Sequence, residues 1–226
     1  MQWQLRKGPS QRGFTLIEAL VVVAIMGVIL LLGLPSLFNY IRRAKVEGTV
    51  QGVANLMRLA RLEAIKQGVP VVVRADFGQN LVTAFVDRNS NLTFDPTAGA
   101  NPRATDREIG RVPLANGVFF WGFQDPSGPA DAAPKGANVV TGFNADPGGG
   151  GLPNVAVFDS SGAIRNPGNL EFGDGRGNFV EVRVSPQATA RVSLWKWNRA
   201  ASTYYQRGNV APVGGTVSGK TTWEWY

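Results

Sequence analysis

The chain has 226 residues, with 23 Lys and Arg against 16 Asp and Glu, a formal net charge of +7, and neither His nor Cys. This length allows one domain with a substantial core and an appendage. Without His and Cys the chain can form no Ser-His-Asp triad, no Cys nucleophile, no disulfide and no metal site of imidazole or thiolate ligands. The positive charge favours an anionic partner, either a nucleic acid or an anionic membrane surface.

The amino-terminal part combines a short basic segment with a long apolar one. Residues 1–13 carry three basic residues and no acid, and residues 14–38 form an apolar run of 25 residues with a single charge, Glu18. Such a run can cross about 30 Å of hydrocarbon as a helix. The preceding positive charge predicts that the amino terminus stays in the cytoplasm and that the rest of the chain crosses the membrane. An ordinary secretory signal is cut after its apolar region, whereas the small residue beside the basic segment, Gly13, precedes it.

The sequence Gly13-Phe14-Thr15-Leu16-Ile17-Glu18 resembles the cleavage site of type IV prepilins, the class III signal peptides. This resemblance implies that a prepilin peptidase cuts after Gly13 and that Phe14 becomes a methylated amino terminus. It also places Pro35 where such pilins carry a helix-kinking proline. The alternative is a plain signal anchor in which Glu18 is incidental.

Glu18 is a carboxylate inside an apolar span, where an unpaired charge is costly to bury. It also lies near a helix amino terminus, whose dipole favours negative charge. The amine of a neighbouring subunit, created by cleavage before Phe14, would be a partner at the same depth. We therefore expect Glu18 to set the register of helices stacked in a filament. The alternative is that its side chain merely extends to the membrane interface.

A second helical half is expected over residues 39–67. Apolar residues recur there at intervals of three and four, which is the pattern of an amphipathic helix: Val46, Val50, Val53, Met57, Ala60 and Ala64. Gly68 and Pro70 should end this helix. The basic cluster Arg42-Arg43-x-Lys45 is interpreted as a solvated flank of the membrane span.

Residues 60–71, ARLEAIKQGVPV, resemble the junction between helix and first strand in the FimT/GspH group of minor pilins and pseudopilins. The match departs from the usual pattern at Leu62, and a Cys common after the first strand in that group is absent. The resemblance implies an α+β, pilin-like fold in which the long amino-terminal helix packs against an antiparallel β-sheet head, residues 68–226. Strands are expected at 69–75, 81–86, 117–123, 154–159, 179–184 and 190–197.

Two groups of polar residues are candidates for metal binding or catalysis. Asp87, Asn89, Asn91 and Asp95 place oxygen atoms at alternate positions, which suits calcium, but Leu92 stands where an EF-hand loop has its turn Gly. We therefore expect no metal and keep calcium as a weak alternative. Asp106 and Glu108 are interpreted as surface charges in a polar loop. No catalytic constellation emerges, so neither enzymatic activity nor a cofactor is expected.

The last quarter of the chain interleaves basic and aromatic residues, a pattern typical of single-stranded nucleic acid binding. The candidates are Arg191, Lys196 and Arg199 with Trp195 and Trp197. Some FimT-like pilins bind DNA through a Gly-Arg-x-Arg motif late in the head, and the stretch here keeps only Arg191. The alternative is that these are ordinary strand residues, with Trp195 and Trp197 on one face.

The sequence thus predicts a minor pilin or pseudopilin, with DNA capture for uptake as the alternative function. The expected partners are other pilin subunits, the prepilin peptidase and the inner membrane. DNA is a further partner under the alternative function. The expected location is the bacterial inner membrane, with the head in the periplasm, and then the filament. A type IV pilus and a type II secretion pseudopilus use the same leader and helix, so both remain open.

Overall fold

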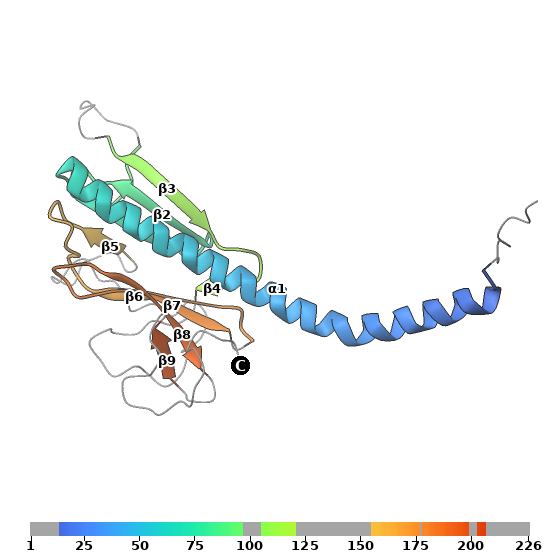
Figure 1. Ribbon diagram of the computed structural model, residues 1–226. Helices are drawn as coiled ribbons and strands as arrows, with labels where there is room; N and C mark the ends of the chain where they lie inside the picture. The colour runs from blue at the N-terminus through green and yellow to red at the C-terminus, as the bar shows by residue number, and fades with distance from the viewer. Residues whose placement is uncertain (1–13, 97–104, 121–154, 177, 199–202, 207–226) are drawn as a thin grey trace, which may run out of the picture. The chain divides into compact units, whose positions relative to one another are not determined.

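The structure is a computed structural model that describes residues 14–96, 105–120, 155–176, 178–198 and, for the backbone, 203–206. The chain divides into two compact units, Met1–Ile41 and Arg42–Tyr226. Figure 1 shows one helix followed by strands. The helix is α1 (Leu16–Gln67), and the strands are β1 (Val71–Asp76), β2 (Leu81–Val86), β3 (Arg107–Pro113), β4 (Phe119–Phe120), β5 (Val155–Phe158), β6 (Gly168–Gly173), β7 (Phe179–Val184), β8 (Val192–Asn198) and β9 (Thr203–Gln206).

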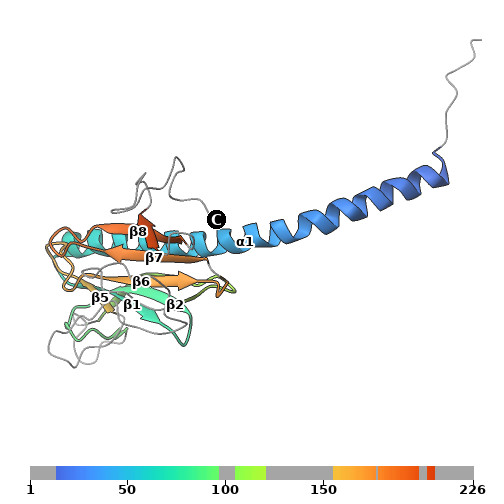
Figure 2. The same ribbon diagram turned by 90° about the horizontal axis from the view of Figure 1, so that it is seen from below.

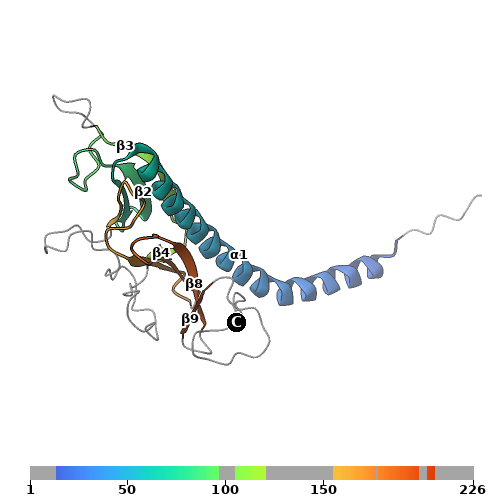
Figure 3. The ribbon, with the colours of Figure 1, turned by 60° about the vertical axis from the view of Figure 1, so that its left-hand side comes forward.

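The strands form two antiparallel sheets, which can be followed separately in Figure 3. The first sheet has the order β3-β2-β1-β5 and the second has the order β4-β6-β7-β8-β9. In the first, β1 pairs with β2 from Val71 opposite Val86 to Asp76 opposite Leu81. The α+β fold, with a long amino-terminal helix and an antiparallel head, is confirmed.

The second half of α1 packs against both sheets through its predicted apolar stripe. All six predicted positions are buried, together with Thr49, Ala54 and Leu56. They share one core with side chains of both sheets, and α1 lies along β7 in Figure 2. Gly68 has a φ of +67° and donates its N–H to the Ala64 carbonyl at 3.0 Å, which ends the helix as predicted.

Two glycines let the helix approach the first sheet closely. A Cβ at Gly52 would lie 3.2 Å from Cγ1 of Val112, and a Cβ at Gly110 would lie 3.2 Å from Cδ1 of Leu56. Both distances are tighter than ordinary van der Waals contact. Glycine is therefore used at these positions for close packing between α1 and β3.

Several strands differ from the expectation. The strands β2 and β7 have the predicted bounds, and β1, β5 and β8 differ from theirs by one or two residues at each end. The expected strand 117–123 is present as the short β4, and residues beyond 120 lie outside the described part. Sequence reasoning missed β3, β6 and β9. Of these, β3 is an edge strand rich in charge, and β6 has a Gly at each end and buries Asn169 and Glu171, so neither has the alternation of a typical strand.

Candidate functional site

The start of α1 coincides with the motif that resembles a prepilin cleavage site. Gly13 lies outside the described residues, and Phe14 and Thr15 precede the helix. The Thr15 hydroxyl accepts the N–H of Glu18 at 3.3 Å, so Thr15 caps the helix and Glu18 occupies the third helical position. Thr-x-x-Glu is the sequence pattern of a capping box, and the structure shows the half in which the Thr15 hydroxyl accepts a backbone N–H. The sequence reasoning missed this cap, in which Thr15 supplies the side chain and Glu18 the backbone N–H.

The apolar run that follows is exposed along the first half of α1. Leu16 and Leu31 are 83% and 74% exposed, and no residue of the most apolar window of the helix, whose mean hydropathy is 2.8, is buried. Within the described residues, α1 is the one helix long and apolar enough to cross a membrane. Pro35 lies inside α1, which continues through it.

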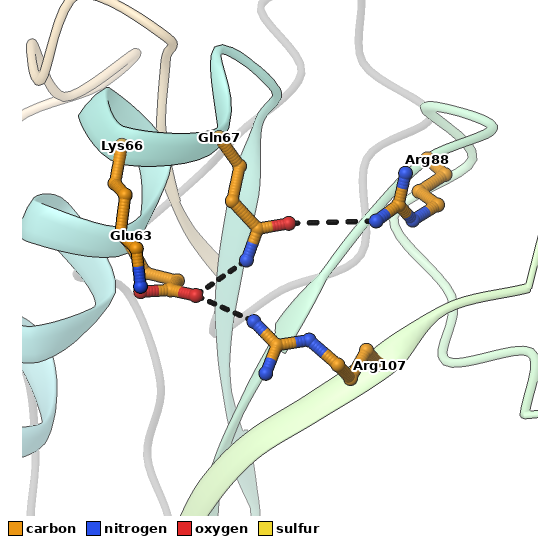
Figure 4. Close-up of polar contacts among 5 residues, drawn as sticks. All are labelled: Glu63, Lys66, Gln67, Arg88 and Arg107. Atoms are coloured by element: carbon orange, nitrogen blue, oxygen red, sulfur yellow. Dashed lines mark hydrogen bonds and ion pairs between the residues drawn. The ribbon is translucent and has the colours of Figure 1, made fainter.

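A polar network joins the end of α1 to the first sheet (Figure 4). Glu63 accepts hydrogen bonds from Nε2 of Gln67 and Nη2 of Arg107, each at 2.5 Å, and its other oxygen lies 3.7 Å from Nζ of Lys66. Arg88, just after β2, donates to Oε1 of Gln67 at 3.5 Å. The hydrogen bonds from Gln67 and Arg107 hold the pKa of Glu63 below its ordinary value.

This network explains part of the segment that resembles the FimT/GspH group. Glu63, Lys66 and Gln67 belong to residues 60–71, and Arg107 reaches them from β3, the strand that the sequence did not reveal. Leu62, where the segment departs from the group, is 63% exposed. The departure therefore falls on the surface of the helix and not in the core.

In the predicted oxygen-rich loop, the polar side chains form hydrogen bonds within the loop. Nδ2 of Asn89 and Nδ2 of Asn91 both donate to Oδ2 of Asp95, at 3.1 and 2.6 Å. Asp87 is buried, and its Oδ2 accepts the N–H of Leu92 at 2.9 Å. Among the residues described, no group of three or more acidic side chains is placed to hold a metal ion. The alternating polar residues thus bind one another in the structure, and calcium binding stays untested.

The same loop covers the outer face of the first sheet. Leu92 and Phe94 pack on the buried cluster that contains Val72 and Phe85, and the Phe85 and Phe94 rings lie 5.2 Å apart. Leu92 has a φ of +62°, the left-handed conformation that a turn Gly would adopt in an EF-hand. Leu92 thus serves as an apolar anchor at this position.

The interpretation of Asp106 as a surface charge is wrong. Asp106 is 4% exposed, and its two carboxylate oxygens accept the N–H groups of Arg88 and Asp95 at 3.0 and 2.9 Å. Glu108 lies in β3 and pairs with Arg111. A carboxylate whose partners are backbone N–H groups leaves no mark in the sequence, which explains the error.

The residues considered for DNA binding lie on different faces of β8. Lys196 stands opposite Val180 in the ladder, on the side of the main core, and is 3% exposed. Trp195 and Trp197 lie on the other face, where Trp197 is 8% exposed. Arg191 is exposed, and Arg199 lies outside the described residues. The structure does not bring Lys196 together with the two Trp side chains.

The outer face of the second sheet contains an ion pair that sequence reasoning missed. Nε of Arg183 donates to Oε1 of Glu181 at 2.6 Å, and the guanidinium carbon lies 4.4 Å from the centre of the Trp195 ring. Glu181 is fully buried, and burial raises its pKa despite the neighbouring Arg183. Trp195 is thereby engaged within the sheet by a cation–π contact.

Comparisons with known proteins give one match near the amino terminus and a second over most of the rest of the chain. Residues 8–34 match the "Prokaryotic N-terminal methylation motif", and residues 49–192, well over half of the chain, match "Type II transport protein GspH". The first match covers the end of the leader and most of the apolar run, and the second runs from the second half of α1 to the first residue of β8. The resemblances stated for residues 13–18 and 60–71 are confirmed.

Individual relatives cover shorter stretches. The pilin-like protein PilA1 of Thermus thermophilus is 37% identical over 91 residues, 38% of this chain and 55% of that protein. A fimbrial protein of Pseudomonas aeruginosa is 38% identical over 105 residues, 46% of this chain and 66% of that protein. The chain thus spans less than two thirds of these relatives.

Among solved structures, the minor pseudopilin EpsH from the Type 2 Secretion System of Vibrio cholerae matches with a TM-score of 0.39 and 18% identity, over 66% of this chain and 95% of that chain. A second structure of EpsH gives a TM-score of 0.42 and 16% identity. On the match over residues 49–192, this chain belongs to the GspH family of type II transport proteins.

Proposed function

We propose that the chain is a minor pilin or pseudopilin, a structural subunit of a filament. Its leader, residues 1–13, would be removed after Gly13, and Phe14 would become the methylated amino terminus. The observation that carries this proposal is the apolar first half of α1, none of whose most apolar window is buried, directly behind a methylation motif. Exposed apolar surface of this extent requires a lipid or protein environment.

The proposal gives this surface two successive environments. Residues 14–38 would span the inner membrane first, with the amino terminus in the cytoplasm and the head in the periplasm. They would then pack among the equivalent helices of other subunits, where Glu18 would meet the Phe14 amine of a neighbour. The head has its own buried core, so it can stay folded during both stages. Both a type IV pilus and a type II secretion pseudopilus fit this scheme, and it involves no enzymatic step.

Processing can be tested at Gly13, because only a small residue fits the expected cleavage site. Gly13→Phe should leave the chain at its unprocessed mass in membranes, whereas the matched variant Gly8→Phe, inside the leader, should be processed normally. Intact mass spectrometry of the membrane-extracted chain would measure both. Normal cleavage and filament entry of Gly13→Phe would refute the assignment.

DNA capture by the head is a second proposal, and it rests on the exposed Arg191. A mobility-shift assay with single-stranded DNA at low salt, using the full chain in a neutral detergent, would test it. Arg191→Ala should abolish the shift, and Lys66→Ala, whose side chain is 77% exposed on α1, should preserve it. The absence of a shift, or equal shifts for both variants, would reject DNA capture through Arg191.

A further inference from the structure

A cavity of about 370 Å³ lies where α1, the segment leading into β4 and the turn between β6 and β7 come together. Its lining brings together cations that are far apart in the sequence: Arg42 and Lys45 come from α1, and Arg176 comes from the turn. Phe119 and Asp174 also line it. The volume falls within the range of small-molecule sites.

The cavity has an unbalanced positive charge. Asp174, the one acidic residue among the described residues that line it, is engaged by its own turn. Its Oδ1 accepts the N–H groups of Arg176 and Asn178, and its Oδ2 accepts a hydrogen bond from Nδ2 of Asn178 at 2.5 Å. Lys45 donates to the Asn116 carbonyl at 3.5 Å. Within the described part of the chain, no carboxylate forms an ion pair with any of the three cations. Three cationic side chains around one hollow are suited to bind a phosphate group.

The length of chain between the apolar run and Arg42 limits how far this cavity residue can lie from the end of the run. The run ends at Phe38, and Arg42 follows four residues later. Even a fully extended chain covers at most about 14 Å over four residues, so Arg42 must lie within reach of the headgroup layer if residues 14–38 span the membrane. Phe119, 43% exposed at the cavity, offers an apolar contact beside the cations.

We propose that this cavity binds the phosphate of an anionic phospholipid headgroup. Free inorganic phosphate carries the same chemical group, so the test below distinguishes the two. The inference rests on the proposed membrane anchoring. Arg42, Lys45 and Arg176 supply the charged donors, and Phe119 contacts the apolar part of the lipid. The bound lipid holds the base of the head at the membrane surface until the subunit leaves the bilayer for the filament.

Arg176 gives the sharpest test, because it is far in sequence from the membrane flank. The full chain would be released from detergent micelles containing equal amounts of phosphatidylglycerol and phosphatidylcholine with the same acyl chains, and native mass spectrometry would count the lipids retained. Arg176→Gln should reduce retained phosphatidylglycerol about tenfold, as the loss of a charge-assisted hydrogen bond implies. The matched variant Lys66→Gln, which removes one positive charge from an exposed position of α1 outside the cavity, should retain the wild-type amount.

Two outcomes would overturn the proposal. One is equal retention of phosphatidylglycerol by Arg176→Gln and the wild type, and the other is displacement of the lipid by inorganic phosphate with phosphate adducts in its place. An unchanged unfolding midpoint of Arg176→Gln would show that the variant is folded. Leader cleavage of Arg176→Gln, followed by mass, should stay normal. Lipid binding and subunit processing can thus fail independently.

Discussion

Gly162 lies in the turn after β5 with a φ of +78°, and a Cβ there would meet Ile65 Cδ1 at 2.5 Å. Gly162→Ala should therefore lower the free energy of unfolding by about 1–3 kcal/mol, from the left-handed backbone and from the clash. Urea unfolding of the full chain in a neutral detergent would measure it. Ile65→Ala in the same chain should recover the part that is due to the clash.

Gly68 provides the matched control for this position. It has a similar φ of +67°, but a Cβ there would have nothing within 4 Å. Gly68→Ala should therefore show the backbone cost alone, about 1 kcal/mol. Equal losses for the two variants would mean that α1 tolerates a methyl group at Gly162 without cost.

Glu63 should make stability depend on pH. Its pKa is lowered in the folded chain by Gln67 and Arg107, so its contribution is present above the unfolded pKa and is lost as the pH falls through the folded value. Glu63→Gln should lower the unfolding midpoint at pH 7, and the difference from the wild type should vanish at acid pH. Arg107→Gln should show the same pH dependence. A difference that persists when the carboxyl is protonated would point to packing instead of charge.

At the scale of the element, the second half of α1 separates a buried stripe from an exposed one. Met57 is fully buried and Leu62 is 63% exposed on the same helix. Met57→Ala should cost about 2–5 kcal/mol of unfolding free energy through a cavity in the main core. Leu62→Ala should stay within about 0.5 kcal/mol of the wild type. Chemical denaturation of both variants would compare them, and similar losses would contradict the assignment of the core face.

The elements that the sequence predicted are those with a periodic apolar pattern. The spacing from Val46 to Ala64 locates the core face of α1. The strands β1 and β2 coincide with β-branched, apolar runs, and β7 has valines at alternate positions. The strand β3 is hidden because Arg107, Glu108 and Arg111 occupy an edge whose side chains are mostly exposed. The loop after β2 is a second case that the sequence could not resolve. Its spacing of polar residues indicates side-chain oxygen atoms, but it does not reveal that Asn89 and Asn91 donate hydrogen bonds to Asp95.

At the scale of the whole molecule, the two units differ in whether their large apolar side chains are exposed or buried. In Met1–Ile41 large apolar side chains such as Leu16 and Leu32 are exposed, whereas Arg42–Tyr226 buries its own in a core built from both sheets. A filament subunit needs both properties, because the first unit must exchange lipid contacts for protein contacts while the second stays folded. The residue of interest for assembly therefore lies in the first unit, where Glu18 is the single charged residue of the apolar run 14–38.

The proposed pairing of the Glu18 carboxylate with a neighbour's amine can be tested with one set of variants. All three variants keep the backbone N–H that donates to the Thr15 hydroxyl, while Gln and Val lose the charge and Asp retains it on a shorter side chain. If pairing with a neighbour's amine fixes the register, Glu18→Gln and Glu18→Val should be processed yet absent from sheared filaments, and Glu18→Asp should be partly incorporated. Immunoblots of the filament fraction, with intact mass of the membrane form, would measure this. Incorporation of Glu18→Gln at the wild-type level would show that the charge of Glu18 is not needed for assembly.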